Sequence, residues 1–306
     1  MNKGAILQGL STYAAFGAKN PRNALQFTDA ELKALTSDDL ISFLQNLFSY
    51  KHSIVYYLQW PQTMENLATT LKGIHKTPTT FKTDLPLVAN FEATSPEKPV
   101  VLFTDYDMVQ AEINWVRPTI KYNVAETPVV ELYNNYFGGG MSSIVFQTIR
   151  ESKALAYSTY AFYRTPSTKN EKYNMIAYVG TQADKIHESI AGMNELLNVF
   201  PASEKALETA KASMKKNYQT ERITQDNIIY TYLNNLEKGV SGDDRQAIYQ
   251  ALDKLTSDDL KKFQDTQLSN KPYNLCIVAS EKKVNLEDLK KYGEVKKLSL
   301  EEVFGY

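Results

Sequence analysis

The three histidines are the residues with the clearest potential for catalysis, because a catalytic zinc ion is usually held by histidines or carboxylates that helical spacing brings together. His52 opens an apolar run that predicts a strand, His75 lies in a segment with linker composition, and His187 has no second histidine one turn away. Neither order of the helical two-histidine zinc motif is present. We therefore expect no metal ligand in this chain and interpret the three histidines as structural or exposed.

The run Gly138-Gly139-Gly140 has the composition of an anion-binding loop, since glycine amides before a helix can cradle a phosphate. No Gly-Lys-Ser/Thr sequence follows, and the preceding residues predict a helix rather than a strand. A turn between two helices with a glycine in the left-handed conformation is a sufficient explanation. No serine lies in a Gly-x-Ser-x-Gly sequence, so a serine hydrolase is not indicated.

The most informative segment is residues 134–158, with the sequence NNYFGGGMSSIVFQTIRESKALAYS. It contains a helix, a glycine turn with Met-Ser-Ser, a second helix ending in arginine, and a Leu-Ala-Tyr strand start. In this order the elements resemble the pitrilysin/insulinase family of zinc metallopeptidases. The resemblance implies that Arg150 and Tyr157 are the family's arginine and tyrosine seven residues apart, which complete the site from the last domain. It also implies that an inverted histidine motif in the first domain holds zinc across a closed chamber.

The chemistry of these two side chains supports the same interpretation. Peptide hydrolysis builds negative charge on the carbonyl oxygen, and a phenol hydroxyl such as that of Tyr157 can stabilise this oxyanion when water is excluded. The Arg150 guanidinium stays charged at any working pH and can bind substrate carbonyl oxygens. The alternative is that Arg150 is a cation favoured at a helix C-terminus and Tyr157 an interior strand aromatic.

An internal repeat indicates how the chain is organised. The hexapeptide LTSDDL begins at Leu35 and recurs 220 positions later at Leu255, and each copy precedes an apolar, strand-like run. Ser37 and Ser257 are predicted to cap the two helices, with aspartates in the first turn. A repeat this long is a whole domain rather than a solenoid unit, so we interpret it as a domain duplication. Two independently arising capped helices are the alternative.

The domain boundaries follow from the repeat and from the resemblance, which extends over most of the chain. Residues 1–60 are expected to be the truncated end of a preceding homologous domain. Residues 61–97, with a short helical pattern followed by prolines, lysines and threonines, have the composition of an inter-domain linker. Residues 98–306 are expected to form a complete peptidase-like C-terminal domain.

The order of elements in residues 98–306 predicts the fold class. Strands at 100–103 and 109–115 read as a hairpin, a helix over 129–136 and another through Ile149 follow, and two further strands lie at about 155–164 and 173–180. Helices then dominate up to about Asp265, before one closing strand that includes Cys276. Strands first and helices afterward predict an α+β two-layer sandwich, with an antiparallel or mixed sheet covered on one face by helices.

The composition of the chain limits the kinds of partner and environment that we expect for it. The 34 basic and 35 acidic residues almost cancel, so nucleic acid is not an expected partner. The single cysteine excludes an intramolecular disulfide, and no segment is long and apolar enough to span a bilayer. We expect a soluble chain of undetermined compartment; an upstream signal on a longer precursor would place it in the periplasm or cell envelope. Apolar helix faces in residues 1–50 would allow a homodimer through the truncated domain.

The leading hypothesis is the C-terminal, substrate-holding part of a zinc endopeptidase that degrades peptides. Its partner would be the N-terminal, zinc-bearing half of the same enzyme, and this chain alone would be inactive. The alternative hypothesis is a non-catalytic subunit of a metallopeptidase-like complex that binds an extended peptide through an exposed strand edge.

Overall fold

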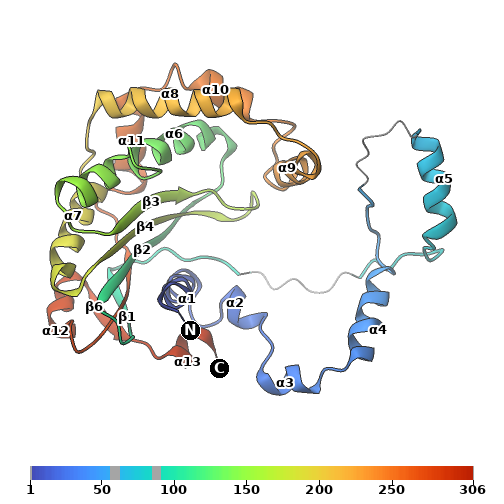
Figure 1. Ribbon diagram of the computed structural model, residues 1–306, viewed down its shortest axis with the longest axis horizontal. Helices are drawn as coiled ribbons and strands as arrows, with labels where there is room; N and C mark the ends of the chain where they lie inside the picture. The colour runs from blue at the N-terminus through green and yellow to red at the C-terminus, as the bar shows by residue number, and fades with distance from the viewer. Residues whose placement is uncertain (1, 56–62, 85–90, 306) are drawn as a thin grey trace. The chain divides into compact units, whose positions relative to one another are not determined.

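The computed structural model describes residues 2–55, 63–84 and 91–305. They form two compact units (Figure 1). The first unit comprises Met1–Ala24, Phe91–Arg222 and Tyr232–Tyr306, and the second comprises Leu25–Asn90 and Ile223–Thr231.

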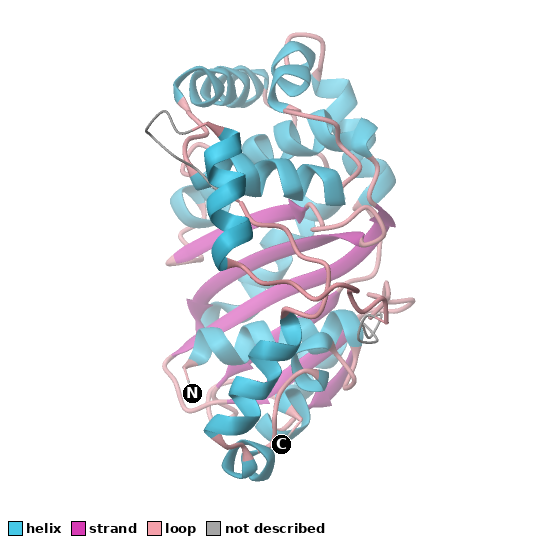
Figure 2. Ribbon diagram, turned by 90° about the vertical axis from the view of Figure 1, so that its right-hand side faces the viewer, coloured by secondary structure: helices cyan, strands magenta, loops and turns pink. Residues whose placement is uncertain are grey.

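The first unit is built on a mixed six-stranded sheet, whose strands are magenta in Figure 2. The strands are β1 (Val100–Asp105), β2 (Gln110–Lys121), β3 (Ser158–Arg164), β4 (Lys172–Gln182), β5 (Asn274–Ala279) and β6 (Glu294–Lys297). Their order is β3-β4-β2-β5-β1-β6. β1 runs parallel to β5 and β6, and the other neighbours are antiparallel. The predicted α+β class with a mixed sheet is confirmed.

The predicted hairpin between β1 and β2 is wrong, because β5 lies between them and pairs with both. All six residues of β5 are buried. A strand that is apolar on both faces is most stable at the centre of a sheet covered on both sides, and that position is between β1 and β2. The short polar segment between β1 and β2 therefore spans the width of an inserted strand.

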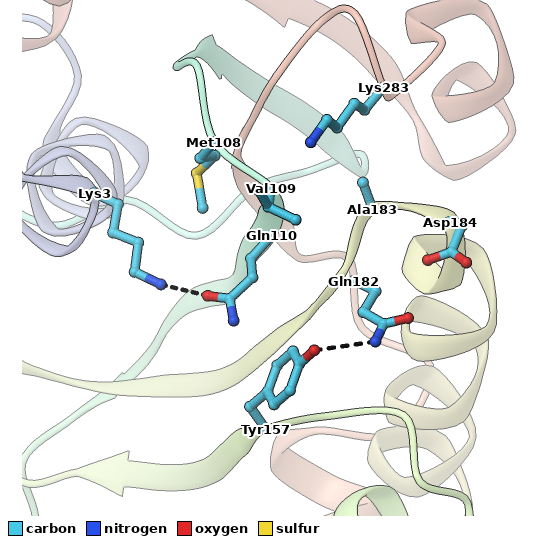
Figure 3. A pocket seen from close by; sticks show the side chains of 9 residues that line it. All are labelled: Lys3, Met108, Val109, Gln110, Tyr157, Gln182, Ala183, Asp184 and Lys283. Carbon is cyan, nitrogen blue, oxygen red and sulfur yellow. Dashed lines mark hydrogen bonds between the residues drawn. The ribbon is translucent and has the colours of Figure 1, made fainter.

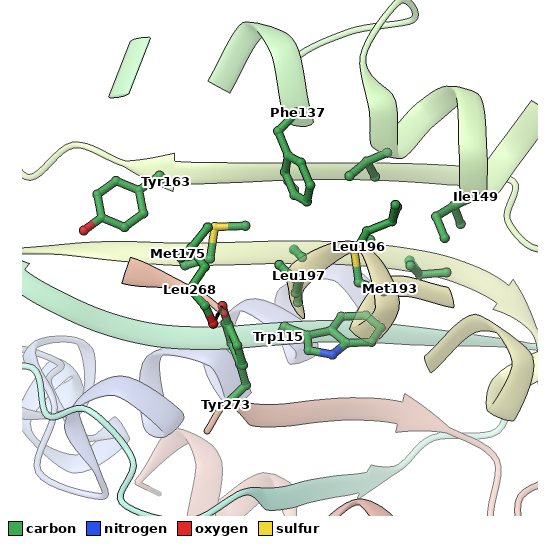
Figure 4. Packing of buried hydrophobic residues seen from close by; sticks show 14 of the residues in the cluster. Trp115, Phe137, Ile149, Tyr163, Met175, Met193, Leu196, Leu197, Leu268 and Tyr273 are labelled. Carbon is green, nitrogen blue, oxygen red and sulfur yellow. Dashed lines mark hydrogen bonds between the residues drawn. The ribbon is translucent and has the colours of Figure 1, made fainter. Parts of the chain in front are cut away.

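A layer of helices covers one face of the sheet. It is formed by α6 (Thr127–Phe137), the π-helix η2 (Phe146–Ser152), α7 (Ile186–Asn198), α8 (Glu204–Thr220), α10 (Arg245–Ala251) and α11 (Ser257–Gln267), and α9 (Asp226–Glu237) lies between α8 and α10 in sequence. Trp115 from β2 lies fully buried under this layer with Phe137 and Met193 (Figure 4). Its indole N–H donates to Asn194 of α7 at 2.8 Å. Burial of each such large side chain contributes about 1.5–3 kcal/mol, so this cluster is the main source of stability.

The opposite face of the sheet carries α1 (Lys3–Phe16) and α13 (Leu300–Phe304). Ile6 and Leu10 of α1 pack with Val116 of β2 and Val278 of β5, and Cys276 is buried among them. The alternation of side chains along each strand allows this, because neighbouring residues such as Trp115 and Val116 point to opposite faces. The N-terminal helix is therefore part of the same unit as the sheet.

Five short elements complete the first unit around these layers. They are α2 (Pro21–Ala24), the 3-10 helices η1 (Val124–Glu126), η3 (Ala183–Lys185) and η4 (Lys290–Tyr292), and α12 (Leu286–Leu289). η3 leads directly from β4 into α7, so it fixes where the strand ends and the helix begins.

The second unit contains α3 (Asp29–Ala34), α4 (Ser37–Leu47) and α5 (Met64–Ile74). His75 is the C-terminal cap of α5. His52 lies in a segment without strand pairing, so the strand predicted to begin there is not formed over residues 51–55. The rest of that predicted strand, from residue 56, lies outside the described residues.

The two copies of the repeated hexapeptide begin helices with the same cap. Thr36 and Thr256 are the N-cap residues of α4 and α11, and each closes a capping box with the aspartate three positions later. The prediction of Ser37 and Ser257 as caps is therefore wrong by one position. The aspartate carboxylate reaches back to the threonine amide, which only this register allows.

Candidate functional site

The glycine turn after α6 is shaped by close contact with β3. A Cβ at Gly138 would lie 2.1 Å from the carbonyl oxygen of Ala161, so only glycine fits. Gly138 itself has φ −140°, and the left-handed cap predicted at the helix end is absent there. The positive φ belongs to Gly140, at 138°. The first glycine is required by packing and the third by backbone conformation.

Asn134 and Gly138 fasten this turn to the outer edge of β3. The Asn134 side-chain oxygen accepts from the Tyr163 amide at 2.7 Å, and its amide group donates to the Tyr163 carbonyl at 3.1 Å. The Gly138 carbonyl accepts from the Ala161 amide at 3.4 Å. A side chain and a loop thus take the hydrogen bonds that a further strand would make at this edge.

The second predicted helix begins as expected near Ser143, whose carbonyl accepts from the Gln147 amide at 3.0 Å. It continues beyond Ile149, through Ser152, as the π-helix η2. Such turns are rare and frequently occur at functional sites. It is followed by Ala154, which has φ 48°. This left-handed residue reverses the chain toward β3.

Arg150 lies on the exposed side of η2. Its side chain is 46 % exposed, and its guanidinium lies 4.9 Å from the centre of the Phe146 ring. The only charged contact recorded for it among the described residues is with Glu151, at 3.7 Å, which is a weak exposed pair. The guanidinium is therefore held by a ring on one side and accessible to another partner.

Tyr157 lies just before β3 and is not an interior aromatic residue, since 54 % of it is exposed. Its backbone amide donates to the Gly180 carbonyl at 2.9 Å, which ties it to β4. Its hydroxyl oxygen accepts from the Gln182 side-chain amide at 3.0 Å. An amide N–H can only donate, so the phenol proton remains available for a second acceptor.

Tyr157 borders a hollow of about 570 Å³, which we call the Tyr157 pocket (Figure 3). Its walls come from the N-terminus of α1, the segment entering β2, the end of β4 with η3, and the turn after β5. The lining residues are Lys3, Met108, Val109, Gln110, Tyr157, Gln182, Ala183, Asp184 and Lys283. Arg150 is not among them, so the two predicted site residues are both accessible but do not share this hollow.

A buried carboxylate contacts Lys3, one of the residues that line this pocket. Glu112 of β2 is only 4 % exposed and receives the Lys3 ammonium at 2.5 Å on one oxygen. Its other oxygen accepts a hydrogen bond from the Tyr178 hydroxyl. Burial, and then the neighbouring Glu112, raise the pKa of Tyr178. The signal for this cluster in the sequence is a glutamate between the apolar residues Ala111 and Ile113 of a strand.

Two of the three histidines lie together, and the third contacts a tyrosine. The Nε2 atoms of His52 and His75 lie 2.7 Å apart, and His187 Nδ1 lies 3.1 Å from the Tyr292 hydroxyl. Within residues 2–55, 63–84 and 91–305, no group of three or more histidine, cysteine, aspartate or glutamate side chains is placed to hold a metal ion. In the same ranges, no helix is long and apolar enough to cross a membrane.

Comparison with known proteins identifies the chain's relatives. Residues 34–214, more than half of the chain, match the family model described as the peptidase M16 inactive domain. A zinc protease of Bacillus subtilis (strain 168), YmxG, itself uncharacterised, is 35 % identical over 85 residues, which is 27 % of this chain and 20 % of that protein. The chain thus spans only a small part of this curated relative.

Two crystal structures share the fold. The peptidase M16 inactive domain from Pseudomonas fluorescens superimposes with a TM-score of 0.65 at 13 % identity, covering 91 % of this chain and 66 % of that chain. A mutant of the ferredoxin protease FusC in complex with Arabidopsis ferredoxin gives a TM-score of 0.63 at 16 % identity, covering 91 % of this chain and 30 % of that chain. At these identities the likeness concerns the fold. The family-model match supplies the assignment: this chain belongs to the peptidase M16 family of zinc proteases, the pitrilysin/insulinase peptidases, and carries its inactive domain.

Proposed function

We propose that this chain is the C-terminal, substrate-holding part of a zinc metalloendopeptidase that degrades peptides, and that it is inactive alone. The zinc ion and the general base come from the N-terminal half of the same enzyme. The observation that carries the proposal is Tyr157, which is half-exposed, lines a pocket, and accepts a hydrogen bond from Gln182 on its hydroxyl oxygen. Its proton is free to be donated to a carbonyl oxygen as negative charge develops there.

Arg150 has a second role in this proposal. Its exposed guanidinium rests on the Phe146 ring and binds carbonyl oxygens of the peptide on either side of the reacting bond. It positions the substrate, whereas Tyr157 stabilises the transition state. Loss of Arg150 should therefore weaken substrate binding, and loss of the Tyr157 hydroxyl should slow the chemical step.

We also propose that residues 1–60 include the end of a homologous preceding domain. Leu40 and Phe43 of α4 are 53 % and 60 % exposed, whereas the residues at the same repeat positions in α11, Leu260 and Phe263, are buried. In the parent enzyme the rest of that domain covers Leu40 and Phe43. Without it, this apolar face would drive self-association, which analytical ultracentrifugation with and without the N-terminal half can measure.

The alternative, a subunit that binds an extended peptide at a sheet edge, receives less support. At the outer edge of β3, the Tyr163 amide donates to the Asn134 side chain, and the Ala161 amide donates to the Gly138 carbonyl. The other edge strand, β6, has only four residues, two of them lysines. Both are devices that discourage strand addition.

The test is peptide cleavage by this chain combined with its zinc-bearing half. Replacement Tyr157→Phe should lower turnover more than ten-fold with little loss of fold, as expected for one oxyanion donor. The matched control is Tyr249→Phe, because the Tyr249 hydroxyl also accepts a side-chain amide, from Gln219 at 2.8 Å, outside the pocket. The chain alone should show no zinc-dependent hydrolysis. Undiminished turnover in Tyr157→Phe would remove this residue from catalysis.

A further inference from the structure

We infer that the Tyr157 pocket is a subsite for a carboxylate group of the peptide substrate, and that Lys283 is the cation that binds it. The inference rests on the proposed function and adds a substrate preference to it. The carboxylate comes either from an acidic side chain close to the cleaved bond or from the C-terminus of the peptide.

The charges around the pocket single out Lys283. Lys3 is already engaged, since its ammonium contacts the Glu112 carboxylate at 2.5 Å and donates to the Gln110 side chain at 2.7 Å. Lys283 is exposed, and in the part of the chain that the structure describes no carboxylate lies within ion-pair distance of it. Asp184 lines a separate wall of the pocket and forms no ion pair with Lys283 (Figure 3). The pocket is thus lined by a lysine ammonium that has no counter-ion within residues 2–55, 63–84 and 91–305.

The rest of the lining suits the carbon atoms that carry such a carboxylate. Met108, Val109 and Ala183 present apolar surface, and Val109 is 74 % exposed although it is aliphatic. Methylene groups of a glutamate side chain, or the side chain of a C-terminal residue, would cover this surface and gain burial energy. An apolar stem ending in a negative charge therefore fits the pocket better than a wholly apolar or a basic group.

The position of Tyr157 connects the subsite to the reaction. Its hydroxyl and the Gln182 amide are hydrogen-bonded to each other and both line the pocket. A peptide whose reacting carbonyl meets the Tyr157 hydroxyl would therefore direct a neighbouring side chain, or a nearby chain end, into the same hollow. Lys283 then determines specificity through charge and has no part in bond cleavage.

The experiment uses this chain combined with its zinc-bearing half and a set of fluorogenic peptides. The peptides carry glutamate or glutamine at successive positions around the cleaved bond, each with a free or an amidated C-terminus. An exposed to half-buried ion pair contributes up to about 1 kcal/mol, so kcat/KM should be about three- to five-fold higher for one carboxylate-bearing peptide than for its amide counterpart. The preference should shrink at high salt, where exposed charges are screened.

Two lysine variants test whether the preference for a carboxylate depends on Lys283. Lys283→Gln should abolish the preference, and Lys282→Gln, which makes the same charge change one residue away and outside the pocket lining, should keep it. A preference that follows the glutamate assigns the pocket to an acidic side chain, and one that follows the free C-terminus assigns it to the chain end; both support the subsite.

Other outcomes overturn the inference. Equal cleavage of all peptides by the unmodified protein, or an unchanged preference in Lys283→Gln, would refute the carboxylate subsite while leaving the proposed function intact. Absence of cleavage of every peptide would instead refute the proposed function. Tyr157→Phe separates the two further, because it should lower kcat for acidic and amide peptides alike without altering their ratio.

Discussion

The substitution Gly138→Ala tests whether contact between the glycine turn and β3 positions the site. A Cβ at this position would lie 2.1 Å from the oxygen and 2.5 Å from the nitrogen of Ala161, whereas ordinary contact begins at 3.4 Å. The turn and the strand would have to separate by about an ångström, at an overpacking cost of about 1–3 kcal/mol. Loss of the hydrogen bond from the Ala161 amide to the Gly138 carbonyl adds about 1 kcal/mol.

The combined loss of about 2–4 kcal/mol should lower the melting temperature of the first unit by roughly 4–15 °C, measured by circular dichroism. Hydrogen exchange should become faster for the amides of Ala161 and Tyr163, which the turn now protects. The control is Gly4→Ala in α1, whose Cβ would meet only Asn2 at an ordinary 3.5 Å. It should leave stability unchanged or raise it by up to about 1 kcal/mol, because alanine favours helices. A Gly138→Ala protein that melts like the parent, with unchanged exchange in β3, would refute the reasoning.

Two further predictions concern titratable groups in the first unit. Complete burial raises the pKa of the Cys276 thiol. The native protein should therefore react with a thiol reagent such as DTNB far more slowly than the denatured protein does. Fast reaction in the folded state would contradict the packing of Cys276 under α1. The pKa of His187 is lowered, first by burial and then by the charge of Lys291. At pH values between the folded and the unfolded pKa, the unfolded chain therefore binds more protons at this residue than the folded chain does. Its contribution to stability should therefore be present above the unfolded pKa of about 6.5 and lost as the pH falls through the lower folded value. Urea unfolding at pH 7.5 and pH 5 should show a smaller loss on acidification for His187→Asn than for the unmodified protein, and an equal loss in both would refute this assignment.

Much of the fold class followed from local sequence pattern, because apolar periodicity reports which face of an element is buried. The helix predicted over residues 129–136 lies within α6, and the strands at about 155–164 and 173–180 correspond to β3 and β4. The separation of β1 from β2 in the sheet could not be predicted in this way. It depended on β5, more than 150 residues further along the chain, whose wholly buried side chains require the centre of the sheet.

The candidate site, like the fold, was predictable from the sequence only in part. The sequence by itself determined the spacing of Arg150 and Tyr157, the glycine turn before them, and the family to which they point, since these are properties of one short segment. Only the tertiary structure decided that Gln182 donates to the Tyr157 hydroxyl, that Lys3 neutralises a buried Glu112, and that Lys283 lines the same pocket with no carboxylate partner among the described residues. These contacts join α1, β2, β4 and the turn after β5. No local pattern encodes them, because the free energy that brings such distant segments together comes from burying the two faces of the sheet they share.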